Sequence, residues 1–205
     1  MFLTEEEILG TSAALNLTCD YFGQNAEMID AFFAANAQRK FTVMGCGSSY
    51  MLSKSAAAVL ASFPETAANA IPAGDYIADP AFWQDTVRGS IVLMLSRSGR
   101  TSEMVWAARK IKQSLGCPII SINAEADNDI TPMSDLELSM PWCHDNSVCQ
   151  TRTVTNLYAA ALLLAARYAK DDGLWQSVHD AAAGNEAFQA KYRPVLEELA
   201  ARDWD

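Results

Sequence analysis

The chain has 205 residues, half of them hydrophobic, with 25 acidic and 15 basic side chains and a formal net charge of −10. A single domain of this length can bury about 70% of the surface that its unfolded chain exposes, so one hydrophobic core is expected. The acidic balance argues against nucleic acid as a partner, because that binding depends on Lys and Arg side chains that neutralise phosphates.

The N-terminal segment, residues 1–36, predicts helices. Thr4 and Glu7 form the pattern of a capping box, so a helix is expected to begin near residue 5. A second helix is expected over residues 26–35, whose apolar side chains share one face: Ile29, Phe32 and Phe33. The first residues lack the basic and then apolar order of a signal peptide.

The next segment, residues 37–171, alternates apolar strands with helices. Strands are expected at residues 42–44, 68–71, 91–95, 119–122 and 136–140, and helices at 49–62, 101–115 and 150–170. This alternation predicts a doubly wound α/β fold, a five-stranded parallel sheet of the flavodoxin-like kind with helices on both faces. Ligands of such sheets bind beyond the carboxyl ends of the strands.

The most informative stretch is a hydroxyl-rich turn, Ser96 to Glu103, between the third expected strand and a helix. Ser and Thr hydroxyls, free backbone N–H groups and the positive end of a helix dipole would attract an anion there, and Gly99 would let the backbone approach it closely. A similar turn, Gly45 to Ser49, follows the first strand. Neither fits the dinucleotide or Walker fingerprints. Two such turns on neighbouring strands predict a small phosphorylated ligand held from both sides.

Together with a third motif, Ser147 to Thr153 at the start of a long helix, these turns resemble the SIS (sugar isomerase) domain over about residues 20–170. The closest resemblance is to the first of the two SIS domains in the isomerase half of glucosamine-6-phosphate synthase and to related double-SIS phosphosugar isomerases. It implies a sugar phosphate as ligand, a hexose or hexosamine 6-phosphate.

The resemblance implies a binding role for residues of all three motifs. The phosphate would be held by hydroxyls and backbone N–H groups of Ser96, Arg97, Ser98, Gly99 and Thr101. Contacts to the phosphate or to the sugar would come from Gly47, Ser48, Ser49, Val148 and Gln150. On the residues alone, Ser48 and Ser49 could instead only cap the following helix. Gln150 replaces a small hydroxyl residue of the synthase and Asp145 replaces a Glu, which leaves the sugar open.

Basic side chains also gather in these motifs of an acidic chain: Arg97, Arg100 and Arg152. They would attract a phosphate dianion, although Arg100 could equally be a solvated loop charge.

The catalytic base is not identified by the sequence. Aldose-ketose isomerisation needs a base that moves a proton between C1 and C2, and commonly a His or another acid that opens the ring. In the double-SIS relatives a Glu and a His from the second domain or a neighbouring subunit serve these roles. The candidates here are Glu103, which the helix dipole alone would favour in a first turn, and His144, in a polar loop where a lone His is commonly a surface residue. Glu65 and His179 are the other titratable side chains weighed.

The last segment, residues 172–205, predicts a helical linker or extension, with a helix from about residue 173 to 201. In the two-domain relatives such a helix leads into the second SIS domain, so the tetrapeptide Arg202 to Asp205 would end the chain where that domain begins. The expected function is therefore the N-terminal half of a sugar-phosphate isomerase or of an amino-sugar-phosphate isomerase or deaminase. The alternatives are a complete single-SIS isomerase working as a homo-oligomer, and a sugar-phosphate sensor without catalysis. A homodimer or larger assembly is expected.

The five cysteines are irregularly spaced and include no Cys-x-x-Cys pair. Neither a disulfide framework nor a zinc site is predicted, and no metal or other cofactor is expected. Free thiols without a signal peptide predict a reduced, cytoplasmic protein. The most apolar helix, residues 157–166, is far shorter than the ~20 residues that span a bilayer, so no membrane partner is expected.

Overall fold

A central sheet of five parallel strands organises the molecule, of which a computed structural model describes residues 2–202. The strands are β1 (Lys40–Gly45), β2 (Ala67–Pro72), β3 (Ile91–Ser96), β4 (Ile119–Asn123) and β5 (Leu136–Ser139), in the order β2-β1-β3-β4-β5. Phe41 lies opposite Ile91 in the register between β1 and β3. This order, with one reversal at β1, is that of flavodoxin-like sheets, and the predicted fold class is confirmed.

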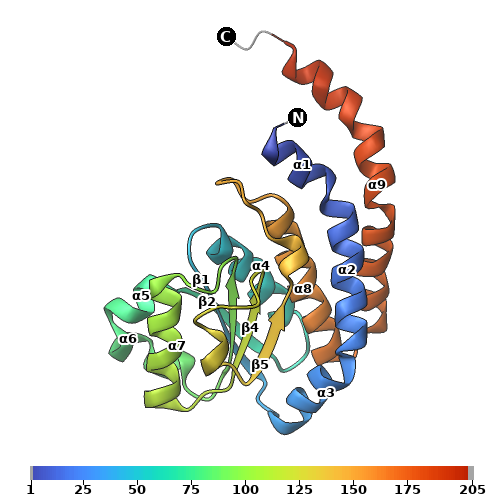
Figure 1. Cartoon of the computed structure of the whole chain (residues 1–205). Helices are drawn as coiled ribbons and strands as arrows, with labels where there is room; N and C mark the ends of the chain where they lie inside the picture. The colour runs from blue at the N-terminus through green and yellow to red at the C-terminus, as the bar shows by residue number, and fades with distance from the viewer. Residues whose placement is uncertain (1, 203–205) are drawn as a thin grey trace.

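Helices cover both faces of the sheet (Figure 1). One face carries α2 (Thr11–Gln24), α3 (Ala26–Ala35), α4 (Ser48–Ala61), α8 (Arg152–Ala169) and α9 (Asp172–Ala200), and α1 (Leu3–Leu9) precedes α2. The other face carries α5 (Ala73–Ala78), α6 (Pro80–Val87) and α7 (Ser102–Leu115). Two 3-10 turns, Thr131–Met133 and Pro141–Cys143, flank β5.

The core is divided by the sheet into two clusters, as β3 illustrates. Leu93 and Leu95 pack in the cluster under α2, α4 and α8, whereas Val92 and Met94 pack in the cluster under α5 and α7. All four side chains are at most 1% exposed. Alternate residues of a strand point to opposite faces, so a central strand covered on both sides must be apolar throughout.

The predicted strands and long helices agree with the structure to within two residues at each end. The helix expected to begin near residue 5 begins at Leu3, and Gly10 separates this α1 from α2. The capping box is wrong: α1 begins at Leu3, Phe2 is its N-cap, and no side chain of the described residues caps it. Glu7 cannot reach back to the helix start because its carboxylate accepts hydrogen bonds from the loop at Ser147.

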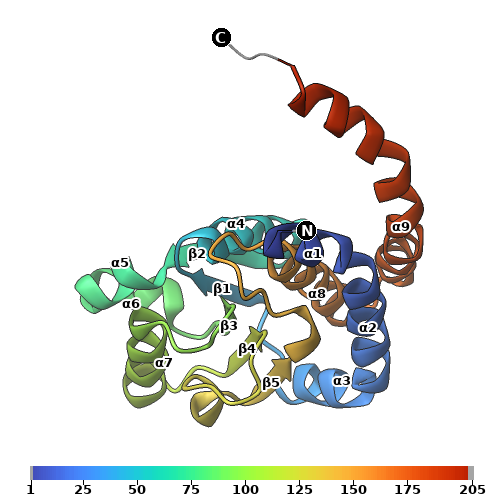
Figure 2. The ribbon, with the colours of Figure 1, turned by 45° about the horizontal axis from the view of Figure 1, so that its top comes forward.

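The C-terminal helix α9 runs beyond the body of the molecule, so its last turns project away from the sheet (Figures 1 and 2). Its first half packs on α2 and α8, and the Asp171 carboxylate caps its start by accepting from the Leu174 N–H at 2.9 Å. Of the predicted terminal tetrapeptide, Asp203, Trp204 and Asp205 lie outside the described residues. Among the helices that are described, none combines the length and apolarity that crossing a bilayer requires.

Candidate functional site

A small cavity of about 100 Å³ lies at the carboxyl edge of the sheet, where β1 and β3 end. All three sequence motifs contribute to its wall: Cys46, Ser49, Leu95, Ser96, Arg97, Ser98, Thr101, Met104 and Gln150. A volume of this size corresponds to a few water molecules, at about 30 Å³ each. The cavity therefore suits a compact polar group better than a whole sugar.

The second motif forms a turn whose hydroxyls stay available as donors. Ser96 Oγ accepts the Gly99 N–H at 3.0 Å, and Ser98 Oγ accepts the Arg100 N–H at 3.2 Å. A hydroxyl that accepts in this way still has its own hydrogen to donate. The turn needs glycine at 99, where φ is +61° and a Cβ would lie 2.5 Å from Asn128 Oδ1.

The first motif brings the start of α4 against the end of β1. A Cβ on Gly45 would lie 2.5 Å from the Ser49 backbone, and Gly47 adopts a φ of +55° as the N-cap of α4. Within residues 2–202 no side chain caps α4, and Ser48 and Ser49 lie inside its first turn, so neither has the capping role weighed above. Ser49 is buried at the cavity, whereas Ser48 is exposed and does not line it.

The third motif is held in place by the buried carboxylate of Asp145. Its Oδ2 accepts the backbone N–H groups of Thr151 at 2.7 Å and Thr153 at 2.9 Å, which caps the start of α8. Arg97 joins this loop to the second motif, because its Nη1 donates to the carbonyl oxygens of Ser147 at 3.0 Å and Asp145 at 3.4 Å. These hydrogen bonds connect the loop after β3 to the loop before α8, and both loops contribute to the cavity wall.

Buried polar atoms that find no hydrogen-bond partner in the described part of the chain gather at this edge. Gln150 Oε1, which belongs to the cavity wall, is one of them. Others lie nearby in the same loops or at the end of β4: Asn123 Nδ2, His144 Nδ1, Asp145 Oδ1, Thr151 Oγ1 and Arg152 Nε. Three of these atoms face a charged group outside hydrogen-bond geometry, because Arg152 Nε lies 3.8 Å from Asp145 Oδ1 and His144 Nδ1 lies 3.5 Å from Glu125 Oε1. Buried polar groups in native proteins are nearly always paired, so such a concentration sets this edge apart from the rest of the described fold.

The three arginines of the motifs occupy different positions. Arg97 lines the cavity. Arg152 donates to the carbonyl of His144, and its Nε lies 3.8 Å from Asp145. Arg100 does not line the cavity, because its guanidinium pairs with Glu125 and with Asp127 at 3.6 Å. Arg100 is therefore a charge of the surface loop, which is one of the two alternatives left open by the sequence.

The two catalytic candidates are not brought together. His144 Nδ1 lies 3.5 Å from Glu125 Oε1, and both residues line a neighbouring cavity of about 330 Å³. Glu103 lies in the first turn of α7, outside the cavity wall. It is close to Cys46, whose pKa is raised first by burial of the thiol and then by the Glu103 charge.

The remaining sequence candidates do not belong to the cavity wall. Val148 is 93% exposed. Glu65 pairs with Arg39 before β1 and β2, at the opposite edge of the sheet. His179 stacks against Trp175 in α9, at 5.0 Å between ring centroids.

Sequence reasoning missed Glu7, a buried acid on α1 that clamps the third motif. Its carboxylate accepts the N–H groups of Asn146 at 2.7 Å and Ser147 at 3.0 Å, and also the Ser147 hydroxyl. Burial raises the pKa of Glu7, but these hydrogen bonds and the nearby Arg152 charge outweigh it, so the pKa lies below its ordinary value. No local pattern could reveal a contact between residues about 140 positions apart.

Acid should weaken this clamp. A carboxyl group whose pKa is lower in the folded protein contributes stability above its unfolded pKa of about 4.5, and that stability is lost as the pH falls through the lower folded value. We expect Glu7→Gln to lower the free energy of unfolding at pH 7 by roughly 1.5–3 kcal/mol, the worth of hydrogen bonds to a charged group. Urea unfolding from pH 7 down to pH 3 measures this, and Glu6→Gln, an exposed neighbour on α1, is the matched control. Equal loss in both variants would contradict it.

Comparison with known proteins gives a family and several similar folds. The SIS domain model matches residues 35–167. Tagatose-6-phosphate ketose/aldose isomerase from Escherichia coli superposes with a TM-score of 0.80 at 20% identity, over 93% of this chain and 54% of that chain. The C-terminal domain of glucosamine-fructose-6-phosphate aminotransferase from Francisella tularensis gives 0.77 at 16% identity, over 98% of this chain and 60% of that chain.

A third structure differs in its extent. The c3406 protein of Escherichia coli CFT073 superposes with a TM-score of 0.66 at 15% identity, over 86% of this chain and 95% of that chain. By contrast, the chain spans about half the length of the tagatose isomerase, and the shared likeness at these identities is one of fold. No curated protein matches the sequence significantly.

Proposed function

Because the chain belongs to the SIS domain family, we propose that its carboxyl-edge cavity binds the phosphate of a sugar phosphate, a hexose or hexosamine 6-phosphate. The observation that carries this proposal is the convergence of all three motifs on one small polar cavity. Ser96, Ser98 and Thr101 would donate hydroxyl hydrogens to the phosphate oxygens, while Gln150 Oε1 would accept a hydroxyl of the sugar. Arg97 would supply positive charge from the wall.

The whole protein is proposed to be a double-SIS isomerase, or an amino-sugar-phosphate isomerase or deaminase, of which this chain is the N-terminal half. Support comes from the tagatose isomerase and the aminotransferase domain, which this chain matches over little more than half their length. The catalytic candidates Glu103 and His144 lie outside the cavity wall, which agrees with a base supplied by another domain or subunit. The predicted cytoplasmic location and the division into residues 1–36, 37–171 and 172–205 stay predictions.

One observation favours a second candidate, a complete single-SIS isomerase. The c3406 protein is matched over 95% of its length, so a chain of this extent is enough to form a whole relative. A sensor without catalysis would need the same cavity and no base.

The direct test is calorimetric titration of the purified chain with a panel of hexose and hexosamine 6-phosphates, and with the same sugars lacking phosphate. We expect saturable binding of at least one phosphorylated sugar and none of its unphosphorylated counterpart. Absence of binding across the panel would contradict the proposal.

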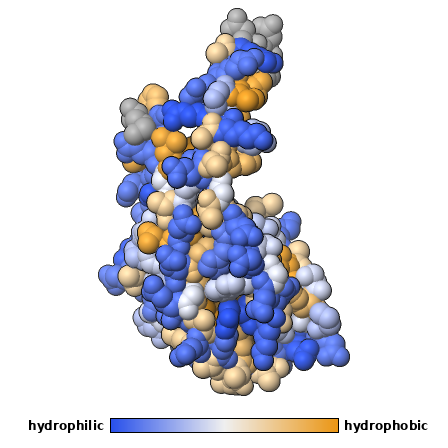
Figure 3. Space-filling view, turned by 90° about the vertical axis from the view of Figure 1, so that its right-hand side faces the viewer, coloured by the Kyte–Doolittle hydropathy of each residue, from blue (hydrophilic) through white to orange (hydrophobic). Residues whose placement is uncertain are grey.

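Self-association is expected from an uncovered apolar face. The last turns of α9 project from the body with apolar residues at the spacing of one helix face: Phe188, Tyr192, Val195 and Leu196. Phe188 and Leu196 are 60% and 62% exposed, and apolar side chains are visible on this part of the surface (Figure 3). Light scattering should give at least twice the chain mass of 22.3 kDa. Phe188→Glu with Leu196→Glu should shift the protein towards monomer, while Ala183→Glu, elsewhere on α9, should not. A monomeric wild type at all concentrations would contradict this.

A further inference from the structure

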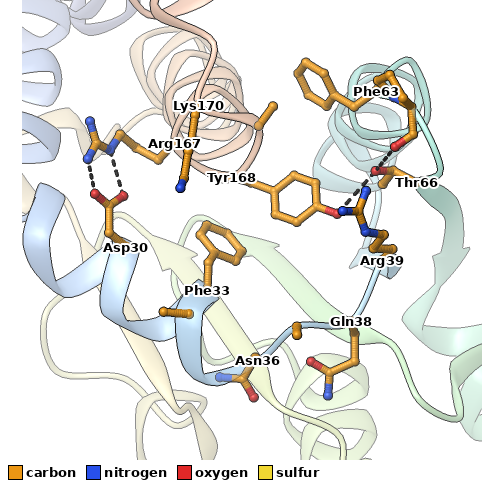
Figure 4. A pocket seen from close by; sticks show the side chains of 14 residues that line it. Asp30, Phe33, Asn36, Gln38, Arg39, Phe63, Thr66, Arg167, Tyr168 and Lys170 are labelled. Carbon is orange, nitrogen blue, oxygen red and sulfur yellow. Dashed lines mark hydrogen bonds and ion pairs between the residues drawn. The ribbon is translucent and has the colours of Figure 1, made fainter.

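A second and larger cavity, of about 700 Å³, lies at the amino edge of the sheet (Figure 4). It is lined by the end of α3, the residues that precede β1 and β2, and the end of α8. The proposed phosphosugar cavity lies at the carboxyl edge, so the two cavities are at opposite ends of β1. Its volume is within the range of small-molecule sites, about 300–1,000 Å³.

One wall of this amino-edge cavity is aromatic and fixed. The Tyr168 ring packs edge-on against Phe33 at 5.2 Å and against the buried Phe41 at 4.7 Å between ring centroids. The Tyr168 hydroxyl lies 3.2 Å from Thr66 Oγ1, which sets the direction of the ring. Phe63 adds a further ring to the lining. A wall held in this way is ready to receive a flat apolar group without rearrangement.

The charged lining is predominantly positive. The lining carries three basic side chains, Arg39, Arg167 and Lys170, and its one acid among the described residues is Asp30. This local excess of positive charge stands in a chain whose net charge is −10. Arg167 is occupied, because its Nε donates to Asp30 Oδ1 at 3.0 Å and its guanidinium lies 5.6 Å from the Trp175 ring. The other two cations are therefore the ones that can meet a ligand.

Lys170 and Arg39 are held weakly by the protein itself. Among residues 2–202, no hydrogen bond or ion pair engages Lys170 Nζ, and Lys170 adopts a φ of +56° as the C-cap of α8. Arg39 pairs with Glu65 at 3.2 Å, but both side chains are well exposed, and such surface pairs contribute little. Both cations are thus free to pair with an anion at little cost.

Gln38 belongs to the lining, but its amide oxygen is not open to a ligand in this structure. Gln38 Oε1 is buried and has no hydrogen-bond partner among the residues described. Figure 4 shows Gln38 and Arg39 on the segment that leads into β1, with the Lys170 and Arg39 side chains on opposite sides of Tyr168.

We propose that the amino-edge cavity is a second ligand site, which binds a small anion carrying a flat aromatic ring, the chemistry of a nucleotide. The ring would pack on Phe33 and Tyr168, and the anionic group would pair with one of the two weakly held cations, Lys170 or Arg39. An anion without a ring would leave the aromatic wall unused, and a ring without charge would leave the cations unpaired. Both parts are needed for affinity.

Adenosine 5′-monophosphate is the probe, with adenosine and inorganic phosphate as its separated halves. Calorimetric titration of the intact chain should show the nucleotide binding about tenfold or more tightly than either half. Lys170→Ala with Arg39→Ala should weaken nucleotide binding by about tenfold or more, the loss of one or more charge-assisted hydrogen bonds. Lys110→Ala, an exposed cation on α7, is the matched control and should bind as the wild type does.

A second pair of variants separates this site from the phosphosugar cavity. Ser96→Ala with Ser98→Ala should leave nucleotide binding unchanged, whereas loss of binding in that variant would place the nucleotide at the carboxyl edge and overturn the proposal. Equal affinity for the nucleotide in the wild type and the Lys170→Ala, Arg39→Ala variant would also overturn it, as would no binding by the wild type. Thermal unfolding of each variant shows that it is folded, so loss of binding is read as loss of the site.

Discussion

Replacing Ser96 and Ser98 together with alanine is expected to weaken the binding of a sugar phosphate by about two orders of magnitude or more. Each hydroxyl accepts a backbone N–H of its own turn and has one hydrogen left for a phosphate oxygen. A hydrogen bond to a charged group is worth ~1.5–3 kcal/mol, and two are lost. The turn also loses the two internal acceptors that shape it, which adds to the effect.

The matched control is Ser102→Ala, because Ser102 belongs to the same hydroxyl-rich turn but is exposed and does not line the cavity. Calorimetry with the best ligand of the sugar-phosphate panel measures the affinity of each variant, and circular dichroism shows whether the fold is kept. A folded double variant that binds with near wild-type affinity would remove the phosphate role from these two serines.

The strand and helix pattern of this fold is readable from the sequence because each central strand is covered on both faces. An apolar run such as Ile91 to Leu95 is then followed at once by a polar turn, and the change in composition marks the end of the strand. The same change places the binding turns, since a hydroxyl-rich segment after a buried strand must lie at the carboxyl edge of a parallel sheet. Local patterns therefore predict both the sheet and the edge where we propose that the ligand binds.

The features that were missed depend on contacts distant in the sequence. Glu7 reads as part of a capping box, yet its partners are Asn146 and Ser147. For Arg100 the sequence leaves a phosphate-attracting role and a solvated loop charge equally open, and only the fold brings Glu125 close enough to pair with it. The short helices α5 and α6 were also missed, although Asp79 before Pro80 is a helix-start signal, with the Asp79 carboxylate accepting the Phe82 N–H at 3.0 Å.

The amino-edge cavity has no sequence signature for a comparable reason. Its lining comes from segments more than 100 residues apart, such as Phe33 and Tyr168, and none of them forms a motif. Only packing of α3 and α8 on the same face of the sheet brings the two rings together. A cavity lined by strand starts and helix ends therefore has no local sequence motif by which it could be predicted, unlike a hydroxyl-rich turn.

We expect the chain alone to show no measurable isomerase activity on glucosamine 6-phosphate or fructose 6-phosphate. Among the described residues, the cavity wall holds the hydroxyl-rich turn that we propose binds phosphate, but no carboxylate or imidazole: Glu103 lies outside it, and His144 lies beside Glu125 in a neighbouring cavity. A positioned general base or acid contributes ~100 to 10,000-fold to such a reaction, and ring opening would also be unassisted. Binding would therefore not lead to proton transfer between C1 and C2.

Incubation with each substrate in deuterated water, followed by NMR, tests this expectation, because isomerisation through a base exchanges the transferred proton with solvent. No deuterium should enter at C1 or C2. Incorporation that persists in Glu65→Gln, a carboxylate at the opposite edge of the sheet, but disappears in Glu103→Gln would contradict the expectation. It would assign Glu103 as the base, reached through a movement of α7 or through a second copy of the chain, and it would favour the complete single-SIS isomerase over one half of a larger enzyme.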